Sequence, residues 1–343
     1  MLKLGVVVAL LMSIGSAAAA SFNCAAATTP LERLICNTPS LSADDDQLAQ
    51  VYTAALSAVS EKSRDALRAG QRSWVRYLAA ICPVSESSDD AARQTQVECI
   101  GENYHSRSRG LESAVHRKGP FLFVQIDHYA AVVATDPDCG NEKAIFKHHF
   151  SYPRIDQPLT PTTTRWNELN VPFSAAMMRR VERSDGGDDD LYYEITLATS
   201  RLISVAWDDW EYGHGAAGCG AAHPNSHAKV ETLMLSPVPH PMQPSDVFRK
   251  DVDWAGRLKA EVSKGVIQWF KDATIAQDRR SLIDSVTTDP TRWRLTPDGL
   301  TVFFQEYELA GYAFGQPEVT VPWTDIRDLL QPDLDLPPKG AGN

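Results

Sequence analysis

The sequence predicts an α+β protein, in which a small all-helical domain cross-linked by disulfides precedes a mixed α/β domain. We expect the second domain to hold an antiparallel-rich sheet packed by two helices. Apolar residues recur at helical spacing in the first third of the chain and alternate with period two from Phe121 onward. Four of the six cysteines lie in the helical part, and 343 residues exceed one typical domain. We place the domains at residues 21–117 and 118–335, followed by a disordered tail at 336–343.

The first 20 residues have the pattern of a secretory signal peptide. Lys3 provides the positive start, Val6 to Met12 the short apolar core, and Ala18 to Ala20 the small-residue cleavage site. No later stretch reaches the roughly 20 apolar residues that a spanning helix needs. The sequence therefore predicts a periplasmic or secreted protein that is soluble after cleavage near Ala20, with no membrane insertion.

The even number of cysteines predicts disulfides in an exported chain. Six cysteines allow fifteen pairings, and spacing makes 24 with 36, 82 with 99 and 139 with 219 the simplest choice. No CxxC motif occurs, so the spacing does not favour a zinc site, and we predict neither a metal nor a cofactor. The six residues are Cys24, Cys36, Cys82, Cys99, Cys139 and Cys219.

The charge is unevenly shared between the two predicted domains. Residues 21–117 carry ten Lys and Arg against twelve Asp and Glu, whereas residues 118–343 carry 22 against 32. This acidity disfavours nucleic acid and anionic membranes as partners and would steer a cationic partner toward the second domain. Simple solubility explains the same charge without any partner.

Three helices are expected in the first domain. Ser42, followed by Asp44 to Asp46, has the pattern of a helix start, because a hydroxyl caps the helix and carboxylates favour its positive end. Apolar stripes then mark the three helices: Leu41, Leu48, Val51, Tyr52, Ala55, Leu56 and Val59; Leu67, Trp74, Leu78 and Ile81; and Val97, Ile100, Tyr104 and Leu111.

A linker at His116 to Pro120 leads into the second domain, where the alternation of apolar and polar residues predicts most of the secondary structure. Ser245 and Asp246 are expected to cap a long helix that continues to Trp269. The other expected elements are strands at 121–127, 129–135 and 146–156, a helix from Pro172, a hairpin at 191–212 that turns near Ser200 and Arg201, a strand at 228–236, and two closing strands around a glycine-rich loop before a short helix.

The first domain carries a characteristic set of residues with specific cysteine and QRxW spacing: Cys24, Pro30, Glu32, Ile35, Cys36, Leu41, Ser42, Asp45 to Leu48, Tyr52, Gln71 to Trp74, Cys82, Cys99, Arg109 and Leu111. On these residues, the segment 22–115 resembles the LprI-type lysozyme-inhibitor N-terminal domain. The resemblance implies a secreted helical module, with lysozyme binding by some members.

The second domain holds a further set of characteristic segments: Tyr152 to Ile155, Leu169 with Asn170, Tyr212 to Gly215, Ala222 to Asn225, Tyr307 to Gly315 and Val319 to Trp323. On these segments, residues 120–330 resemble the extracellular domain of the anti-sigma factor RsiV and the non-catalytic region of the deacetylase PdaC. The middle motif departs from the usual pattern, because AAGCGAA expands its turn. The resemblance implies an α+β fold and, by analogy with RsiV, recognition of lysozyme.

No motif for a nucleophile elbow, phosphate loop, zinc protease or dinucleotide site occurs in the chain after the signal, so we predict no catalytic residue. One dense polar cluster stands out as a partner-binding loop, with a structural loop or a metal or acid/base site as the alternatives. Tyr312 and Phe314 are added as exposed anchors. The cluster consists of Asp208, Asp209, Glu211, Tyr212, His214, His223, Asn225 and His227.

The predicted function is that of a non-enzymatic, exported binding protein of the bacterial envelope, a lysozyme inhibitor or lysozyme-binding protein that occludes the cleft of its target. The expected partner is lysozyme or another cationic cell-wall hydrolase, and peptidoglycan is a further candidate. The alternatives are a peptidoglycan-modifying enzyme, an accessory glycan-binding module and a structural envelope protein.

Overall fold

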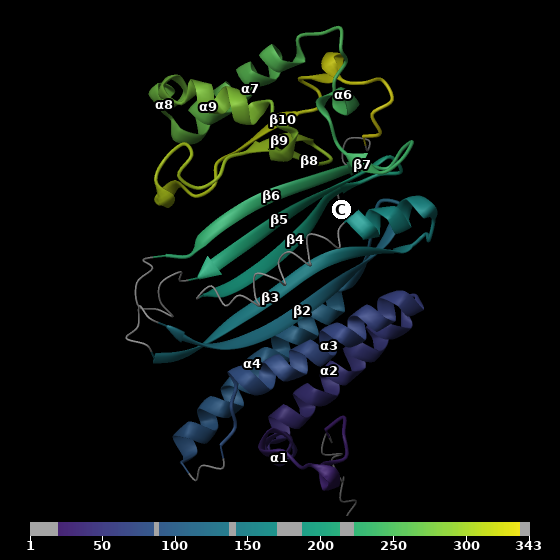
Figure 1. Cartoon of the computed structure of the whole chain (residues 1–343), viewed down its shortest axis with the longest axis vertical. Coiled ribbons are helices and arrows are strands. Elements are labelled where there is room, and N and C mark those ends of the chain that lie inside the picture. Colours follow the sequence, from purple (N-terminus) through teal and green to yellow (C-terminus); the bar gives the residue numbers. More distant parts are fainter. Residues whose placement is uncertain (1–19, 86–88, 137–141, 170–186, 213–222, 337–343) are drawn as a thin grey trace, which may run out of the picture. The chain divides into compact units, whose positions relative to one another are not determined.

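The computed structural model describes residues 20–85, 89–136, 142–169, 187–212 and 223–336 (Figure 1). The expected signal peptide, apart from Ala20, lies outside these residues. So do Cys139, His214 and Cys219, the helix expected from Pro172, and all but the first residue of the expected tail. None of the helices in the described ranges is both long and apolar enough to cross a membrane.

The chain forms two compact units that interleave along the sequence. Residues 1–54 and 82–112 make one unit, and residues 55–81 and 113–343 make the other. A central part of the helical region therefore belongs with the sheet. The expected domain bounds also predict that residues 21–117 and 118–335 fold separately. Expression of the two fragments tests this prediction.

The first unit is helical and carries two disulfides. A 3₁₀ turn, η1 (Cys24–Ala26), precedes α1 (Pro30–Asn37), α2 (Pro39–Ser57) and α4 (Asp90–Ser113), and the last two helices end just beyond the unit boundaries at residues 54 and 112. Thr29 and Glu32 form a capping box at α1: the Glu32 N–H donates to Thr29 Oγ1, and the Thr29 N–H donates to Glu32 Oε2. The apolar side chains buried here include Leu41, Leu48, Ile100, Tyr104 and Leu111.

Disulfides join Cys24 to Cys36 and Cys82 to Cys99, with Cα atoms 5.7 and 5.8 Å apart. These are two of the pairs that spacing favours, and the pair Cys139–Cys219 stays a prediction. In the chain-entropy account a bridge that closes a loop of about 15 residues stabilises a fold by about 3 kcal/mol. Such bridges compensate for the small apolar core of a short helical unit.

The second unit is built on a seven-stranded sheet with strand order β1 to β7. Every neighbouring pair is antiparallel except β3 and β4, which run parallel over three residue pairs from His148 with Asp189 to Phe150 with Leu191. The antiparallel-rich α+β fold is therefore confirmed. The strands are β1 (Val115–Lys118), β2 (Phe121–Asp136), β3 (Glu142–Gln157), β4 (Asp188–Ala198), β5 (Leu202–Tyr212), β6 (Asn225–Met234) and β7 (His240–Pro241).

Helix α3 (Glu61–Ile81) covers the outer edge of β2. Strand β1 pairs only with the first four residues of β2, so the rest of that edge needs other partners. The Tyr129 N–H donates to Ser73 Oγ of α3, 3.2 Å away. Leu67 of α3 packs in one apolar cluster with Val124 and Ile126 of β2. This helix is the second of the three predicted from the sequence.

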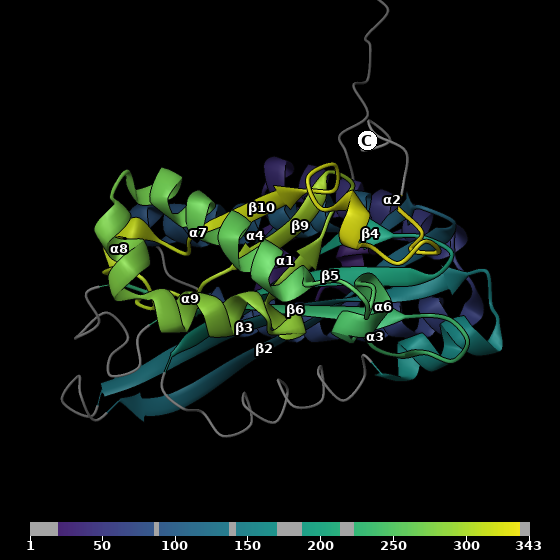
Figure 2. The same ribbon diagram turned by 90° about the horizontal axis from the view of Figure 1, so that it is seen from above.

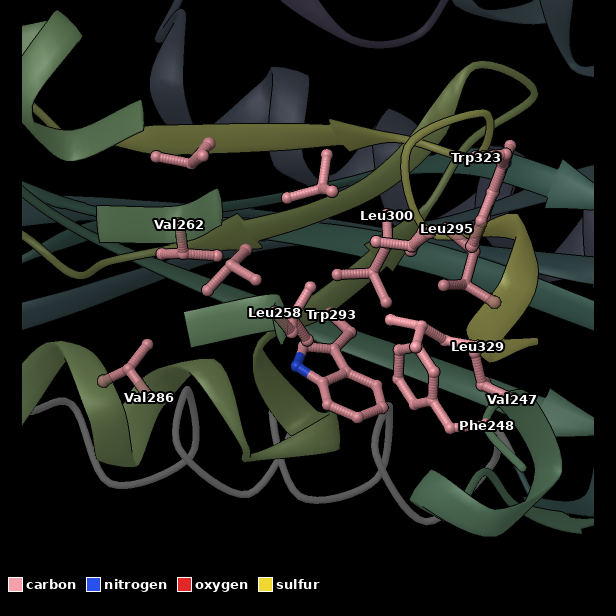
Figure 3. Packing of buried hydrophobic residues seen from close by; sticks show 14 of the residues in the cluster. Val247, Phe248, Leu258, Val262, Val286, Trp293, Leu295, Leu300, Trp323 and Leu329 are labelled. Atoms are coloured by element: carbon pink, nitrogen blue, oxygen red, sulfur yellow. The ribbon is translucent and has the colours of Figure 1, made fainter. Parts of the chain in front are cut away.

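A second, three-stranded sheet has the order β10-β9-β8 and packs against helices (Figures 1 and 2). Leu258, Val262 and Val266 of α7 are fully buried, and Trp293 of β8 donates its indole N–H to Thr287 O at 2.8 Å. Figure 3 shows Leu258, Val262 and Trp293 in this core. The elements here are α6 (Pro244–Val247), α7 (Trp254–Phe270), α8 (Ala273–Asp278), α9 (Arg280–Thr287), β8 (Trp293–Leu295), β9 (Gly299–Phe303) and β10 (Glu318–Pro322).

Several expected boundaries in the second unit are wrong. The residues expected as a linker form β1 and a hairpin turn, in which Gly119 has φ 55°. The strands expected at 121–127 and 129–135 are one strand, β2. The long helix begins at Trp254 and is capped by Asp253, because Ser245 and Asp246 lie in the separate helix α6. More than two helices pack in this unit, including one at 161–169.

Helix α7 approaches β10 so closely that Gly265 has no room for a side chain. A Cβ at this position would overlap with Cγ1 of Val319, whose branched side chain has little freedom to move. We expect Gly265→Ala to lower the free energy of unfolding by about 1–2 kcal/mol, because overpacking outweighs the better helix propensity of alanine.

Gly110 in α4 provides the matched control, because a Cβ there meets no atom within 4 Å. Gly110→Ala should stabilise its helix by up to about 1 kcal/mol. Thermal and urea unfolding of the full chain compare the two variants. An unchanged or raised stability of Gly265→Ala would contradict the packing described here.

Candidate functional site

Residues 304–316, the β9–β10 loop, are fixed to strand β6 by side chains that bond to its backbone. The Gln305 side chain acts like a strand partner for Ala228: its Oε1 accepts from the Ala228 N–H at 3.1 Å, and its Nε2 donates to Ala228 O at 2.5 Å. Gln316 Nε2 donates to Ser226 O at 3.2 Å, and the Ser226 hydroxyl donates to Glu306 Oε1 at 2.7 Å. The loop therefore has a defined position on the edge of the sheet.

A tight turn in this loop holds Tyr307 in a left-handed backbone conformation, with φ 65°. That conformation is unfavourable for a bulky residue. The Glu308 N–H donates to Gln305 O, and the Gln305 N–H donates to the Glu308 carboxylate at 2.7 Å. Arg292 holds the same carboxylate with two further hydrogen bonds of 2.6 and 3.2 Å. The turn thus keeps an exposed tyrosine in a strained conformation, which is typical of functional surfaces.

Three rings gather above this turn. The rings of His223 and Tyr312 stack with centroids 3.6 Å apart and planes 13° apart. His223 Nδ1 lies 3.0 Å from Pro224 O and so must carry a proton. In the neutral imidazole, Nε2 is then the acceptor for the Tyr307 hydroxyl, 2.9 Å away. The hydrogen bonds thus fix both the tautomer of His223 and the position of Tyr307.

Further aromatic side chains extend this cluster over the surface. Phe314 is 55% exposed, and its ring lies 5.4 Å from that of Phe270 at the end of α7. Tyr212, at the end of β5, is 49% exposed and close enough to contribute to the pKa shift of Tyr312. We call the set Tyr212, His223, Tyr307, Tyr312 and Phe314 the aromatic patch.

The electrostatic surroundings of Tyr312 disfavour ionisation of its phenol. Desolvation, followed by the nearby carboxylate of Glu306, raises the pKa of Tyr312 above its usual value. Since tyrosine titrates near pH 10 even without such a shift, Tyr312 brings a neutral hydroxyl to the patch at physiological pH. Its rings and hydroxyls can bury apolar groups and hydrogen-bond at the same time, as is common at protein interfaces.

The carboxylates expected in the partner-binding loop do not all lie together. Side chains alternate along β5, so Asp208 shares a face with Tyr212, whereas Asp209 and Glu211 point to the opposite face. Asp208 is exposed as a residue, yet partial burial of its carboxyl raises its pKa, an effect that Arg294 reduces. Glu211 is 5% exposed. Of the three, only Asp208 is on the same face of the strand as the patch residue Tyr212.

The remaining predicted residues divide as follows. His223, Tyr312, Phe314 and Tyr212 come together in the aromatic patch, and Asn225 is exposed at the start of β6, opposite Glu211. His214 lies outside the described residues. Tyr307, which was not among the predicted site residues, is 54% exposed, because the loop leaves the strand pattern after Phe304. Strand alternation does not apply in such a loop, so no sequence pattern marks the exposure of Tyr307.

A second polar cluster lies inside the sheet, where the sequence predicted no role. His148, 2% exposed, has its Nδ1 3.1 Å from Asp189 Oδ2 across the parallel pair of strands. His149 Nε2 lies 3.3 Å from Asp127 Oδ1, and its ring stacks on Tyr129 at 4.2 Å. The first pair joins β3 to β4, and the second joins β3 to β2. Across the described residues, no group of three or more His, Cys, Asp or Glu side chains has the geometry of a metal site.

Two known families match different segments of this chain, in the same order as the two resemblances seen in the sequence. Residues 23–111 match the family described as "Lysozyme inhibitor LprI", and residues 245–324 match "Protein of unknown function (DUF3298)". The predicted resemblance of the first part of the chain to LprI-type lysozyme inhibitors is therefore confirmed. A search of curated proteins found no match.

Two crystal structures of DUF3298 family proteins are similar to this chain. The one from Bacteroides fragilis shares 15% identity, covering 62% of this chain and 96% of its own, with a TM-score of 0.40. The one from Pseudomonas aeruginosa PAO1 shares 14% identity, covering 64% of this chain and 99% of its own, with a TM-score of 0.45. At these TM-scores the likeness supports no conclusion about a site.

The hydrogen bonds of Gln305 predict how firmly the β9–β10 loop is held on the sheet. Gln305→Ala leaves the Ala228 N–H and C=O without their side-chain partner, so we expect a loss of about 1–3 kcal/mol of stability. Amide hydrogen exchange should speed up over residues 304–316. Gln277→Ala on the exposed side of α8 is the control and should change neither quantity. Equal exchange in the two variants would show that Gln305 does not hold the loop.

Proposed function

We propose that this protein is an exported lysozyme-binding protein that inhibits its target by occluding the catalytic cleft. The observation that carries the proposal is the match of residues 23–111 to the lysozyme inhibitor LprI family. Disulfides in the described chain fit an oxidising compartment outside the cytoplasm. The predicted signal peptide supports the same location.

The aromatic patch is the proposed contact surface of the second unit. It offers large exposed rings on a loop fixed by hydrogen bonds, so little ordering entropy is lost on binding. Aromatic anchors of this kind commonly supply most of the binding energy at an interface. The surrounding chain is acidic, with 32 Asp and Glu against 22 Lys and Arg from residue 118 onward, which would attract a basic enzyme.

An accessory glycan-binding module is the second candidate function. Exposed rings such as those of Tyr307 and Phe314 are also suited to packing against the flat faces of sugar rings. Co-sedimentation with purified peptidoglycan separates the candidates. Binding to peptidoglycan with no affinity for any lysozyme would favour the glycan module.

The first prediction for this function concerns salt. We expect the mature protein to bind at least one of the chicken-type, goose-type and invertebrate-type lysozymes, and more weakly as salt rises. Screening shortens the range of the attraction from about 10 Å at 0.1 M to about 3 Å at 1 M salt. Calorimetry at two salt concentrations measures both effects. No heat of binding with any of the three at tens of micromolar would contradict lysozyme binding.

The second prediction locates the contact. Phe314→Ala should weaken lysozyme binding by about tenfold or more, mainly through faster dissociation, because a buried aromatic anchor is lost. Asp208→Asn should slow association and reduce the salt dependence. Val238→Ala removes an apolar side chain that is 65% exposed and lies outside the patch, so it should have no effect. Unchanged binding by both the Phe314→Ala and the Asp208→Asn variants would place the contact on the helical unit instead.

A further inference from the structure

A pocket of about 600 Å³ lies at the end of β10, outside the aromatic patch. Its volume is within the range of sites for small ligands and peptide side chains. Arg327 and Asp298 contribute charged groups, and both are exposed. The apolar part of the wall is formed by Trp323, Leu330, Leu334, Leu336, Pro297 and Pro322.

Hydrogen bonds fix the walls of this pocket. The C-terminal wall is held by the turn between β4 and β5, where Ser200 Oγ donates to Asp335 Oδ2 at 2.7 Å and Arg201 pairs with Asp333 at 2.8 Å. On the other side, the Trp323 indole N–H donates to Thr296 O at 2.9 Å. The pocket is therefore formed before any ligand arrives, which lowers the entropy cost of binding.

The pocket borders the open edge of the three-stranded sheet, because β10 is the terminal strand in the order β10-β9-β8. Two hydrogen bonds show which residues of β10 direct their backbone N–H and C=O groups toward β9: the Phe304 N–H donates to Pro317 O, and the Trp323 N–H donates to Asp298 O. In an antiparallel ladder the direction of these backbone groups alternates from residue to residue. Val319 and Val321 therefore also direct theirs toward β9.

The N–H and C=O of Thr320 consequently point away from β9, toward the outer edge. Thr320 is exposed and lines the pocket. Of the two neighbouring outward positions, Glu318 lies outside the pocket lining, and Pro322 has no N–H and so limits uncontrolled pairing along the edge. One residue of β10 thus offers a donor and an acceptor beside an apolar pocket.

We propose that β10 and this pocket bind the carboxyl-terminal end of an extended apolar peptide by strand addition. The peptide backbone pairs with the N–H and C=O of Thr320, an apolar side chain enters the pocket beside Trp323, and the terminal carboxylate pairs with Arg327. Main-chain pairing supplies affinity in this mode of recognition, and the side-chain pocket supplies specificity. Arg327 supplies the charge complementarity, because guanidinium groups match carboxylates in two-point geometry.

The residues that follow the pocket wall are a poor match for the site. Residues 337–343 read PPKGAGN and contain no large apolar side chain to fill the pocket. The peptide therefore belongs to a partner. This site does not involve the residues proposed to contact lysozyme, so either proposal can fail without the other.

Fluorescence polarisation with full-length protein tests the proposal. The probe is a fluorescein-labelled Thr-Val-Thr-Leu-Val peptide with a free carboxyl terminus, compared with its C-terminal amide and a backbone N-methylated form. We expect saturable binding of the acid, about tenfold weaker binding of the amide because a charged contact is lost, and no binding of the N-methylated form. No saturable binding of the acid up to 1 mM, or equal binding of the acid and N-methylated forms, would overturn strand addition.

Variants and hydrogen exchange assign the contacts. Arg327→Gln should abolish the preference for the acid over the amide, whereas Arg280→Gln, exposed and outside the pocket, should preserve it. In the unaltered protein, the acid peptide should slow exchange of the Thr320 amide. A preference that survives Arg327→Gln, or unchanged exchange at Thr320, would overturn the assignment. Removal of residues 337–343 should leave affinity unchanged, and a tenfold gain would show that the chain's own end occupies the site.

Discussion

The free edges of the seven-stranded sheet are the constraint on which the surrounding structure of the second unit depends. An uncovered strand edge leaves backbone groups without partners and invites pairing with other chains. Helix α3 covers β2, with Ser73 accepting the Tyr129 N–H. The β9–β10 loop covers part of β6, with Gln305 in place of a strand partner for Ala228. Both coverings come from segments distant in sequence.

The covering of β6 also creates the candidate binding surface. The same residues that satisfy the strand edge hold the loop in place, and the loop then carries Tyr307 in its strained conformation and Tyr312 on the ring of His223. A surface that is fixed for structural reasons loses little entropy when it binds a partner. In this way the satisfaction of backbone groups and the proposed recognition of lysozyme depend on one set of hydrogen bonds.

The sequence predicted the regular parts of this structure well. The hairpin that turns near Ser200 and Arg201 was predicted because alternating strands flank a polar turn, and the structure has it between β4 and β5. Helix α3 was predicted from its apolar stripe, but not its place in the sheet unit, because periodicity shows that a face is buried and not against what. The split of Asp208 from Asp209 follows from strand alternation and could have been predicted once β5 was extended to Tyr212.

The irregular parts could not be predicted from the sequence. The exposure of Tyr307 depends on a left-handed residue inside a loop, which no local pattern in the sequence marks. The pairing of His148 with Asp189 depends on parallel strands that lie about 40 residues apart in the chain. Long-range contacts of this kind can be located only when the order of the strands is known. They define the geometry of the aromatic patch and of the polar cluster at His148.

Hydrogen exchange of the protein with and without an excess of lysozyme tests whether the aromatic patch is the contact surface. We expect slower exchange over residues 304–316 and at the start of β6 when the complex forms, with no change in the hairpin turn at residues 199–201. Binding without protection in the β9–β10 loop would contradict the claim that the aromatic patch is the contact surface.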